Sequence, residues 1–421
     1  MTPEVKKRIE QIRQGIVPEG YKKGKIGIVP IKWNEIPFST LFTSTSEYTD
    51  DLEQYPLYSL TIEDGITAKT ERYERSHLVK KENSYKVVRP NDYAYNPMNI
   101  RFGAVARHKG DIPVAVSGYY DIFTTVHESD LVFMDSFLTY GPMITYYNKV
   151  STGSLVEKQR VHFSDFLEFS LALPTLEERK KIAAILSTQD KAIELQGRKI
   201  EELKRFKKGY LERMFPRKGQ KVPEKRFPGF TDDWEQRKAK ELFVSTADKG
   251  YPELPVLSAT QDRGMIRRDE NSINIFHDKK NEAGYKRVLP GQFVIHLRSF
   301  QGGFAHSAIE GITSPAYTVF GFSEPEKHDS EYWKYVFTSK SFIQRLETVT
   351  YGIRDGRSIS YEEFLTLGFV YPSKAEQTAI ARYLDKLSDL ITLHQRKLEE
   401  MKRQKKALMQ LLLTGIVRVR L

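Results

Sequence analysis

Apolar residues recur at alternating spacings of four and three between residues 174 and 215, and the same pattern returns 198 positions later, between residues 372 and 413. A period of 3.5 residues places one apolar seam along each helix, as in a coiled coil. A proline opens both stretches, and Pro216 or Gly415 follows them, as at helix ends. The sequence therefore predicts two long helices. Their seam positions are Ile182, Leu186, Gln189, Ile193, Gln196, Ile200, Leu203, Lys207, Tyr210 and Met214, and in register Ile380, Leu384, Leu387, Ile391, His394, Leu398, Met401, Lys405, Leu408 and Leu412.

The two stretches are copies of one another, because fifteen of their 42 aligned positions are identical. The densest block is RKIEELKRFKK, starting at Arg198, against RKLEEMKRQKK. An amphipathic helix of this length must bury its seam, and the other copy is the simplest partner. Two matched polar breaks, Gln196 with His394 and Lys207 with Lys405, are expected to set how the helices align, since a polar seam residue commonly fixes the register.

A different pattern fills residues 31–166, where short segments rich in Val, Ile, Tyr, Phe and Thr lie between Gly, Pro, Asn and Asp, as is typical of strands and turns. A second such block, residues 234–364, repeats the first in outline, and LYSLTIEDG at Leu57 aligns with VLSATQDRG at Val256. The chain therefore consists of two halves, each a strand-rich domain followed by a long helix. The expected strands of the first block are YPLYSL (55–60), SYKVV (84–88), DYAYN (92–96), AVARH (104–108), DIPVAVSGYY (111–120) and MITYY (143–147).

This order predicts an α+β fold in which two mixed, strand-rich globular domains are separated by two long helices, packed as an antiparallel coiled coil about a pseudo-twofold axis. Parallel packing fits a continuous chain less easily. At ~1.5 Å per residue each helix is about 60 Å long, so an antiparallel pair is expected to hold the domains apart. Thr2, Pro3 and Gly15 also predict a short helix. The expected segments are an N-terminal helix in 1–20, a globular domain in 21–170, a helix in 171–216, a second globular domain with its entry linker in 217–369, and a helix with a C-terminal tail in 370–421.

The composition narrows the possible chemistry. The chain has no cysteine, which excludes disulfides, thiolate metal sites and cysteine nucleophiles. None of the nine histidines lies three or four residues from another, so a helical zinc pair is absent, and we expect no metal and no cofactor. The stretch GYKKGKIG at Gly20 lacks the spacing of a phosphate-binding loop. The N-terminus is charged and no run of about 18 apolar residues offers a membrane span, so we expect a cytoplasmic protein.

The net charge of +11 is concentrated in two places. Residues 197–217 carry eight Lys or Arg and three Glu, a net +5, and residues 395–420 carry eight and two, a net +6. The basic surplus therefore belongs to the C-terminal ends of the two predicted helices. Part of it suits the negative end of a helix dipole. The alternative is a positive surface that faces a polyanion or an acidic partner protein.

These features resemble the specificity subunit of type I restriction-modification enzymes over nearly the full chain. PTLEERKKIAAIL at Pro174 and PSKAEQTAIARYL at Pro372, with the basic blocks that follow, look like the central and distal conserved regions of that family. The linker KRFPGFTDDWEQRK, from Lys225 to Lys238, is similar to the segment that opens its second target-recognition domain. Order and spacing carry the resemblance more than any single motif does.

The resemblance implies a targeting subunit that is not itself an enzyme. In that family each globular domain, a target-recognition domain, reads one half of a bipartite double-stranded DNA site, and the helices fix the gap between the halves. Two methyltransferase subunits dock on the helices, and restriction/translocase subunits join them for restriction. The sequence agrees, since it has no Walker A motif, no GxGxxG and no NPPY-type adenine-methylation motif, of which Asn96-Pro97-Met98 has only the beginning.

Base readout needs polar and basic side chains that reach base edges, and others that clamp phosphates. Any one such residue is most simply a solvated charge, but equivalent sets in the two halves point to one shared face. In the first domain the expected DNA contacts are Lys69, Arg72, Arg75, Lys80, Lys81, Asn96, Asn99, Arg101 and Arg107. In the second they are Arg263, Arg267, Arg268, Arg298, Ser299, Gln301, Arg354 and Arg357. The helices add Lys204, Arg205, Lys207, Lys208, Lys402, Arg403, Lys405 and Lys406, which we expect either near the phosphates of the unread spacer or against the methyltransferase subunits.

Two other functions stay open. A protein-interaction scaffold with a helical spine would show no sequence-selective DNA binding, whereas phosphate contacts make binding fall steeply as salt rises. A self-contained restriction or methylation enzyme would need turnover by this chain alone, dependent on S-adenosylmethionine or a metal.

Overall fold

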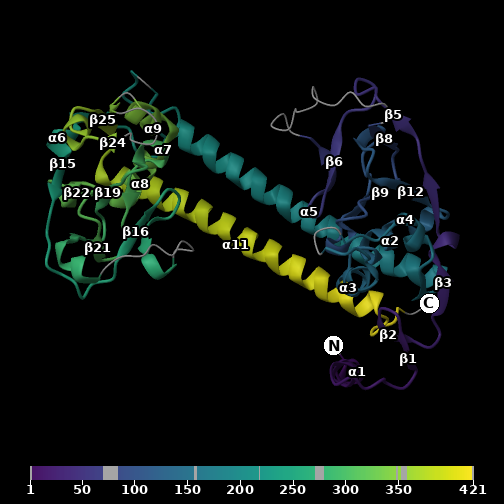
Figure 1. The fold of residues 1–421 in the computed structure, drawn as a ribbon. Coiled ribbons are helices and arrows are strands. Elements are labelled where there is room, and N and C mark those ends of the chain that lie inside the picture. Colours follow the sequence, from purple (N-terminus) through teal and green to yellow (C-terminus); the bar gives the residue numbers. More distant parts are fainter. Residues whose placement is uncertain are drawn as a thin grey trace. The chain divides into compact units, whose positions relative to one another are not determined.

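The chain folds into two compact units, and the computed structural model describes residues 2–69, 84–155, 159–217, 219–270, 279–347, 349–351 and 358–419. Unit 1 comprises Met1–Gly197 and Arg396–Leu421, and unit 2 comprises Arg198–Gln395 (Figure 1). Each unit therefore contains one globular domain and one half of each long helix.

The two predicted long helices are present as α5 (Leu176–Arg213) and α11 (Lys374–Leu413), drawn in teal and yellow in Figure 1. Every predicted seam position on both helices is buried or half-buried. Leu195 and Leu393, which lie off the seam at equivalent places in the repeat, are both 63% exposed. The 3.5-residue period therefore identified the buried face of each helix.

The seam lysines make equivalent contacts in the two units. In unit 1 the Lys405 ammonium of α11 pairs with the Asp190 carboxylate of α5. In unit 2 the Lys207 ammonium of α5 donates to the Ser388 hydroxyl of α11 at 2.8 Å. The repeat aligns Asp190 with Ser388 as it aligns the two lysines. In each unit the early part of one helix meets the late part of the other, so the helices pack antiparallel, as predicted.

The globular domain of unit 1 is rich in short strands, and five of the six segments predicted as strands contain one, namely β6, β8, β9, β10 and β11. Its four-stranded antiparallel sheet has the order β10-β9-β12-β4, and a three-stranded sheet has the order β11-β8-β5. The elements of unit 1 before α5 are α1 (Pro3–Arg13), β1 (Tyr21–Gly24), β2 (Gly27–Pro30), β3 (Asn34–Pro37), β4 (Phe42–Thr45), β5 (Tyr48–Thr49), β6 (Tyr58–Thr61), β7 (Gly65–Ala68), β8 (Tyr85–Val88), β9 (Tyr93–Tyr95), β10 (Val105–Arg107), β11 (Val114–Ser117), β12 (Asp121–Thr125), α2 (Leu131–Phe137), α3 (Gly141–Val150), α4 (Phe163–Leu167) and β13 (Ser170–Leu173).

The globular domain of unit 2 repeats this arrangement. Its four-stranded antiparallel sheet has the order β15-β22-β19-β20, which matches β4-β12-β9-β10 strand for strand. The elements of unit 2 between α5 and α11 are β14 (Glu235–Lys238), α6 (Ala239–Leu242), β15 (Phe243–Thr246), β16 (Leu257–Thr260), β17 (Gly264–Arg267), β18 (Lys286–Val288), β19 (Phe293–Ile295), α7 (Ser299–Gly302), β20 (Ala305–His306), β21 (Gly311–Thr313), β22 (Thr318–Phe322), α8 (Ser330–Thr338), α9 (Lys340–Glu347), β23 (Thr350–Tyr351), β24 (Ser358–Ile359), α10 (Tyr361–Phe364) and β25 (Gly368–Tyr371).

The central sheets are held by aromatic packing. Tyr93 on β9 stacks on Phe123 of β12, with ring centroids 5.1 Å apart, and Phe293 stacks on Phe320 at the same place in unit 2, at 5.6 Å. All four side chains are at most 1% exposed. Rings of this size contribute a large share of a core's buried apolar area, so the two domains are stabilised in the same way.

One predicted strand is wrong. MITYY (143–147) lies in the helix α3, not in a strand. Gly141 and Pro142 open that helix, and proline is favoured in the first helical turn because its missing N–H has no partner there. Met143 and Tyr147 are the buried residues of α3, four positions apart and on one face. The β-branched and aromatic composition of the segment hid this period of four.

The start of each long helix is tied to the segment that follows the other helix. Glu178 on α5 accepts a hydrogen bond from the Trp33 indole N–H at 3.2 Å and pairs with Arg418, which lies after α11. Glu376 on α11 pairs with Arg226, which lies after α5, with Nη2 2.7 Å from Oε2. Both glutamates are 1% exposed. Because a buried carboxylate needs a charged or hydrogen-bonding partner, each unit fixes both helices at one end.

The predicted N-terminal helix is confirmed as α1. The Thr2 hydroxyl accepts a hydrogen bond from the Val5 N–H at 3.4 Å, Pro3 opens the helix, and Gly15 has a positive φ of 76°. Thr2 is thus the N-cap. Within the described ranges, no helix has both the length and the apolar character needed to cross a membrane.

Candidate nucleic-acid interface

Each unit carries one exposed hairpin with the same internal frame. In unit 1 it joins β6 to β7, and the Thr61 hydroxyl accepts the Asp64 N–H at 3.1 Å and donates to the Gly65 carbonyl at 3.3 Å. In unit 2 it joins β16 to β17, and Thr260 makes the same two bonds at 3.0 and 2.8 Å. The two turn glycines have φ of +70° and +68°, a conformation that glycine adopts at no steric cost.

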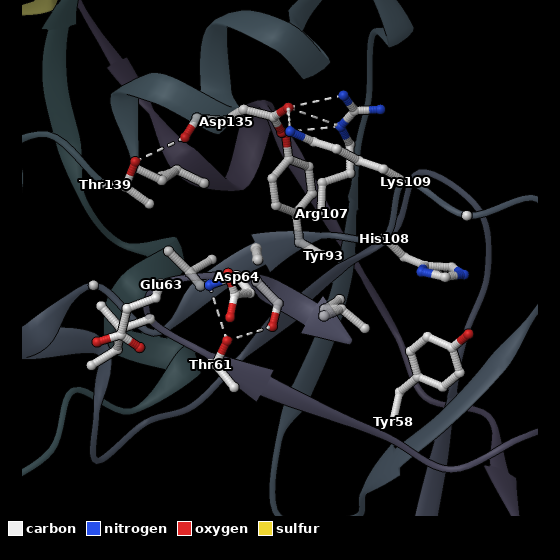
Figure 2. Close-up of a pocket in the computed structure, with 18 of the residues that line it drawn as sticks. Tyr58, Thr61, Glu63, Asp64, Tyr93, Arg107, His108, Lys109, Asp135 and Thr139 are labelled. Atoms are coloured by element: carbon white, nitrogen blue, oxygen red, sulfur yellow. Dashed lines mark hydrogen bonds and ion pairs between the residues drawn. The ribbon is translucent and has the colours of Figure 1, made fainter. Parts of the chain in front are cut away.

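Each hairpin turn forms one wall of an open pocket. The pocket of unit 1 has a volume of about 690 Å³ and is drawn in Figure 2, and that of unit 2 has a volume of about 570 Å³. Equivalent elements line both, namely the hairpin, the strand β10 or β20, and the helix α2 or α8. One seam lysine of the long helices reaches each pocket, Lys405 in unit 1 and Lys207 in unit 2. The two pockets are therefore the same site in the repeat.

The unit 1 pocket is organised around the carboxylate of Asp135. Arg107 donates to it from Nε at 3.0 Å and from Nη2 at 2.9 Å, and the Tyr93 hydroxyl donates at 2.8 Å. The Lys109 ammonium lies 3.3 Å from the same carboxylate (Figure 2). Burial acts to raise the pKa of Asp135, but the hydrogen bonds from Arg107 and the charge of Lys109 outweigh it, and this pKa is lowered. The carboxylate therefore stays charged.

The unit 2 pocket has the opposite charge at the equivalent position. Lys334 aligns with Asp135, and its ammonium lies between Glu331 and Asp385, 3.0 Å from the latter. The Tyr335 hydroxyl donates to Asp385 at 2.7 Å. His306 occupies the place of Arg107, because Arg107 is paired with Tyr93 of β9 and His306 with Phe293, the equivalent residue of β19. The two pockets thus share a frame but offer different chemistry.

Three side chains of unit 1 that were predicted to contact DNA make bonds within the protein. Arg107 is held by Asp135, as above. Asn96 is 8% exposed, and its side-chain oxygen accepts the N–H groups of Met98 and Asn99 at 3.1 and 3.3 Å, so it caps a turn. Arg101 donates to Gln159 at 3.0 Å and lies over the Phe102 ring at 4.6 Å. Their contacts with DNA, and those of Asn99, stay predictions.

Several predicted contacts of unit 2 lie close together. Gln301 accepts a hydrogen bond at 3.1 Å from Gln261 in the hairpin turn, next to the exposed side chain of Arg263. Arg298 is also exposed, whereas Ser299 is fully buried, and its hydroxyl accepts the His296 N–H at 2.8 Å. The structure therefore gives Ser299 the role of fixing the loop.

The remaining predicted residues are exposed or half-buried, paired within the protein, or outside the part of the chain that the structure describes. Lys69 is exposed after β7, Arg267 pairs with Asp269 at 3.3 Å, and Arg268 is half-buried. Lys207 and Lys405 are interhelical contacts, whereas Lys208 and Lys406 are exposed on the helices. Lys204, Lys402 and Arg403 each pair with a glutamate three residues earlier, and Arg205 is exposed. The predicted contacts Arg72, Arg75, Lys80, Lys81, Arg354 and Arg357 lie outside the described residues.

Among the charged residues that line the two pockets, the sequence analysis predicted Arg107, Arg263, Lys207 and Lys405 but missed others. Among those missed are Asp135 and Lys109 in unit 1, and Glu331, Lys334 and Asp385 in unit 2. Of these five, only Glu331 and Lys334 share an element, α8, so the packing of separate segments brings each group together. Aligning the two halves of the sequence could have shown that Lys334 stands at the position equivalent to Asp135. In the described ranges, no cluster of three or more His, Asp or Glu side chains has the arrangement of a metal site.

The loop of unit 2 depends on a neutral histidine, which gives a pH prediction. The His296 ring nitrogen Nδ1 accepts the Arg298 N–H at 3.3 Å. Burial, and then the Arg298 charge, lower the pKa of His296 to about 4. As pH falls from about 6.5 to 4 the unfolded chain gains this proton but the folded chain does not, so unit 2 should lose up to about 3 kcal/mol of stability. Urea unfolding of the His296→Gln variant should lose this part of the acid sensitivity, whereas His162→Gln, at an exposed site of unit 1, should keep it. Equal acid sensitivity in both variants would contradict the assignment.

The fold and the paired pockets define a class of protein, one with a duplicated unit in which the same exposed hairpin is presented twice with different chemistry. A family model described as "Type I restriction modification DNA specificity domain" matches residues 136–205. The chain is 29% identical over 272 residues to the type I restriction enzyme MjaVIII specificity subunit of Methanocaldococcus jannaschii, covering 61% of this chain and 64% of that relative. It is 22% identical over 442 residues to the putative type I restriction enzyme MjaX specificity subunit of the same organism, covering 99% and 93%.

The fold agrees with these sequence matches. A solved chain from work on complex assembly and conformational transition of the type I R-M system superposes with a TM-score of 0.54 at 15% identity, covering 92% of this chain and 99% of that chain. The family model and the two relatives together indicate a type I restriction-modification specificity subunit. The α+β prediction, with two domains and a packed helix pair, is confirmed.

Proposed function

We propose that this chain recognises a bipartite double-stranded DNA site for a type I restriction-modification complex. Each globular domain reads one half of the site, the helix pair sets the gap between the halves, and methyltransferase subunits dock on the helices. Restriction/translocase subunits join the complex for restriction. The chain itself performs no catalysis and uses no cofactor.

The observation that carries this proposal is the matched pair of exposed hairpin sites on an internally repeated frame. Equivalent frames support two reading sites of one kind, and the change from Asp135 to Lys334 supports two different half-sites. A twofold protein reads two half-sites at a fixed separation, which the symmetry of double-stranded DNA allows. The continuous helices α5 and α11 offer a rigid element of fixed length for that separation.

The charge of the helices supports contact with a polyanion. The net +5 and +6 of the two basic segments account for the whole net charge of the chain. The exposed residues Arg205, Lys208 and Lys406 leave cationic groups on the outer face of the helices. We assign these to the phosphates of the unread spacer or to the methyltransferase subunits, as predicted from the sequence.

A selection experiment tests the proposal. The full-length chain is incubated with a pool of DNA duplexes that carry a long randomised segment, and the retained duplexes are sequenced. We expect two short blocks of fixed bases separated by a gap of fixed length and free sequence. The logarithm of the binding constant should fall linearly with the logarithm of salt concentration, because phosphate contacts release counterions. Enrichment of one continuous block, or of no sequence, would contradict the proposal.

A further inference from the structure

We propose that the three residues at the tip of each hairpin, Ile62-Glu63-Asp64 in unit 1 and Gln261-Asp262-Arg263 in unit 2, determine which bases each half-site contains. The inference rests on the proposed function and names, within it, the side chains that read base edges. Of these six residues, only Arg263 was a candidate from the sequence.

The tips differ while the frame around them is the same. The threonine before each tip makes the same two hydrogen bonds in both units, and the glycine after it has nearly the same positive φ. The glycine after each tip cannot be replaced freely by a residue with a side chain. A Cβ added to Gly264 would lie 2.3 Å from the His306 carbonyl oxygen, and one added to Gly65 would lie 3.2 Å from the Ala106 Cβ. Binding residues are disproportionately found on loops that a rigid scaffold positions, and each tip is such a loop.

The tips are exposed and polar. All six tip residues are exposed, and Ile62 is 52% exposed although it is a large apolar residue. Polar side chains held on a rigid turn lose little additional freedom on binding, so they suit a recognition role. About half of the Ile62 side chain is therefore free to contact a bound partner.

The chemistry of each tip matches a different set of base edges. In the major groove, Arg is bidentate to guanine, Gln is bidentate to adenine, and Glu or Asp accepts from the amino group of cytosine, while an apolar side chain contacts the thymine methyl group. The tip Gln261-Asp262-Arg263 therefore offers adenine, cytosine and guanine contacts. The tip Ile62-Glu63-Asp64 offers a methyl contact and two acceptors, and it carries no donor for guanine.

The neighbours of each tip extend the same surface. In unit 2 Gln261 is hydrogen-bonded to Gln301, and a Cβ on Gly302 would lie 2.9 Å from the Gln261 side chain, so this glycine lets the tip approach α7 closely. In unit 1 Phe102 holds the place of Gly302, is 50% exposed, and lines the pocket below the tip. The acidic tip of unit 1 has the cationic groups of Arg107 and Lys109 in the same pocket (Figure 2), which reduces its repulsion of phosphates.

The test exchanges the tips in the full-length chain. The variant I62Q/E63D/D64R gives unit 1 the tip of unit 2, and it keeps Thr61 and Gly65. Selection from the same randomised pool should keep the bases of one half-site and change those of the other, with a preference for guanine of about tenfold at a position where the wild-type chain has none. The reverse variant Q261I/D262E/R263D should change only the other half-site and should lose guanine there.

Two controls separate the possible outcomes. Glu53→Arg makes the same change of charge as D64R at an exposed turn of the same domain, and it should leave both half-sites unchanged. Circular dichroism verifies that each variant is folded. Unchanged bases in both tip variants, or weaker binding with the same bases, would overturn the assignment of the tips while the bipartite function stands. A wild-type chain that selects no bipartite sequence would overturn the proposed function, and the tip assignment with it.

Discussion

Replacing Arg179 with methionine should destabilise unit 1 by about 3–5 kcal/mol, the largest effect expected of a single substitution here. Its guanidinium donates to both oxygens of Asp130, from Nε at 2.7 Å and from Nη2 at 2.8 Å, and to the Pro174 carbonyl at 2.9 Å. The two side chains are 5% and 2% exposed. The substitution leaves the Asp130 carboxylate buried without its counter-charge, and that desolvation cost is the source of the loss.

The neighbouring lysine supplies a matched control for this prediction. Lys180 makes an ion pair with Glu177 at 3.0 Å, but both side chains are largely exposed, so Lys180→Met should change stability by less than about 1 kcal/mol. Hydrogen exchange in increasing urea, followed by mass spectrometry, resolves the two units. Protection should fall in residues 84–173 of the Arg179→Met variant and should stay near wild type in unit 2. Similar protection in the Arg179 and Lys180 variants would show that the buried pair does not hold α5 in place.

In unit 2 a neutral residue takes the place of the Arg179 guanidinium. Gln377 aligns with Arg179 and is fully buried. Its side-chain oxygen accepts the Asp329 N–H at 2.9 Å, and its nitrogen donates to the Pro372 carbonyl at 2.8 Å. A buried ion pair in unit 1 and a buried amide in unit 2 therefore connect the start of a long helix to its globular domain. This agrees with the finding that ion pairs in protein interiors are replaceable by neutral groups.

The helices and the repeat could be predicted from the sequence because their signals are local and periodic. The spacing of apolar residues identified the buried seam, and the matched lysines at 207 and 405 are interhelical contacts in both units. The role of Gln196 and His394 in the register stays a prediction. Five of the six segments predicted as strands contain a strand. The sixth lies in α3, because a Tyr- and Ile-rich segment has the composition of a strand even when proline starts a helix.

The candidate site could be predicted only in part, because a sequence shows polar residue types but not their partners. Arg263 and Gln301 were predicted, and they lie around one hairpin tip. Asn96 and Ser299 have the same composition signal, yet their side chains bond to nearby backbone N–H groups. The pairing of Arg107 with Asp135 joins two elements that meet only in the fold.

Lengthening both long helices by four residues should lengthen the gap between the half-sites. Four residues add ~6 Å and a rotation of ~40° beyond one full turn. One base pair adds 3.4 Å and about 34°. We therefore expect a gap that is longer by about one to two base pairs. Insertion after Arg198 and after Arg396 places the added turns midway between the two interhelical lysine contacts, and both of those contacts are kept.

The binding to the original gap should fall on the order of 100-fold, because only one half-site can then be read in register. A four-residue insertion at Gly229, in an exposed turn outside both helices, is the matched control and should leave the gap unchanged.

The most direct measurement is the gap length selected from the randomised pool by the wild-type chain, the double-helix insertion and the Gly229 insertion. Two half-sites whose bases stay constant, with a gap that grows only in the helix variant, are predicted. A gap that stays the same in all three proteins would contradict the claim that the helix pair spaces two reading sites.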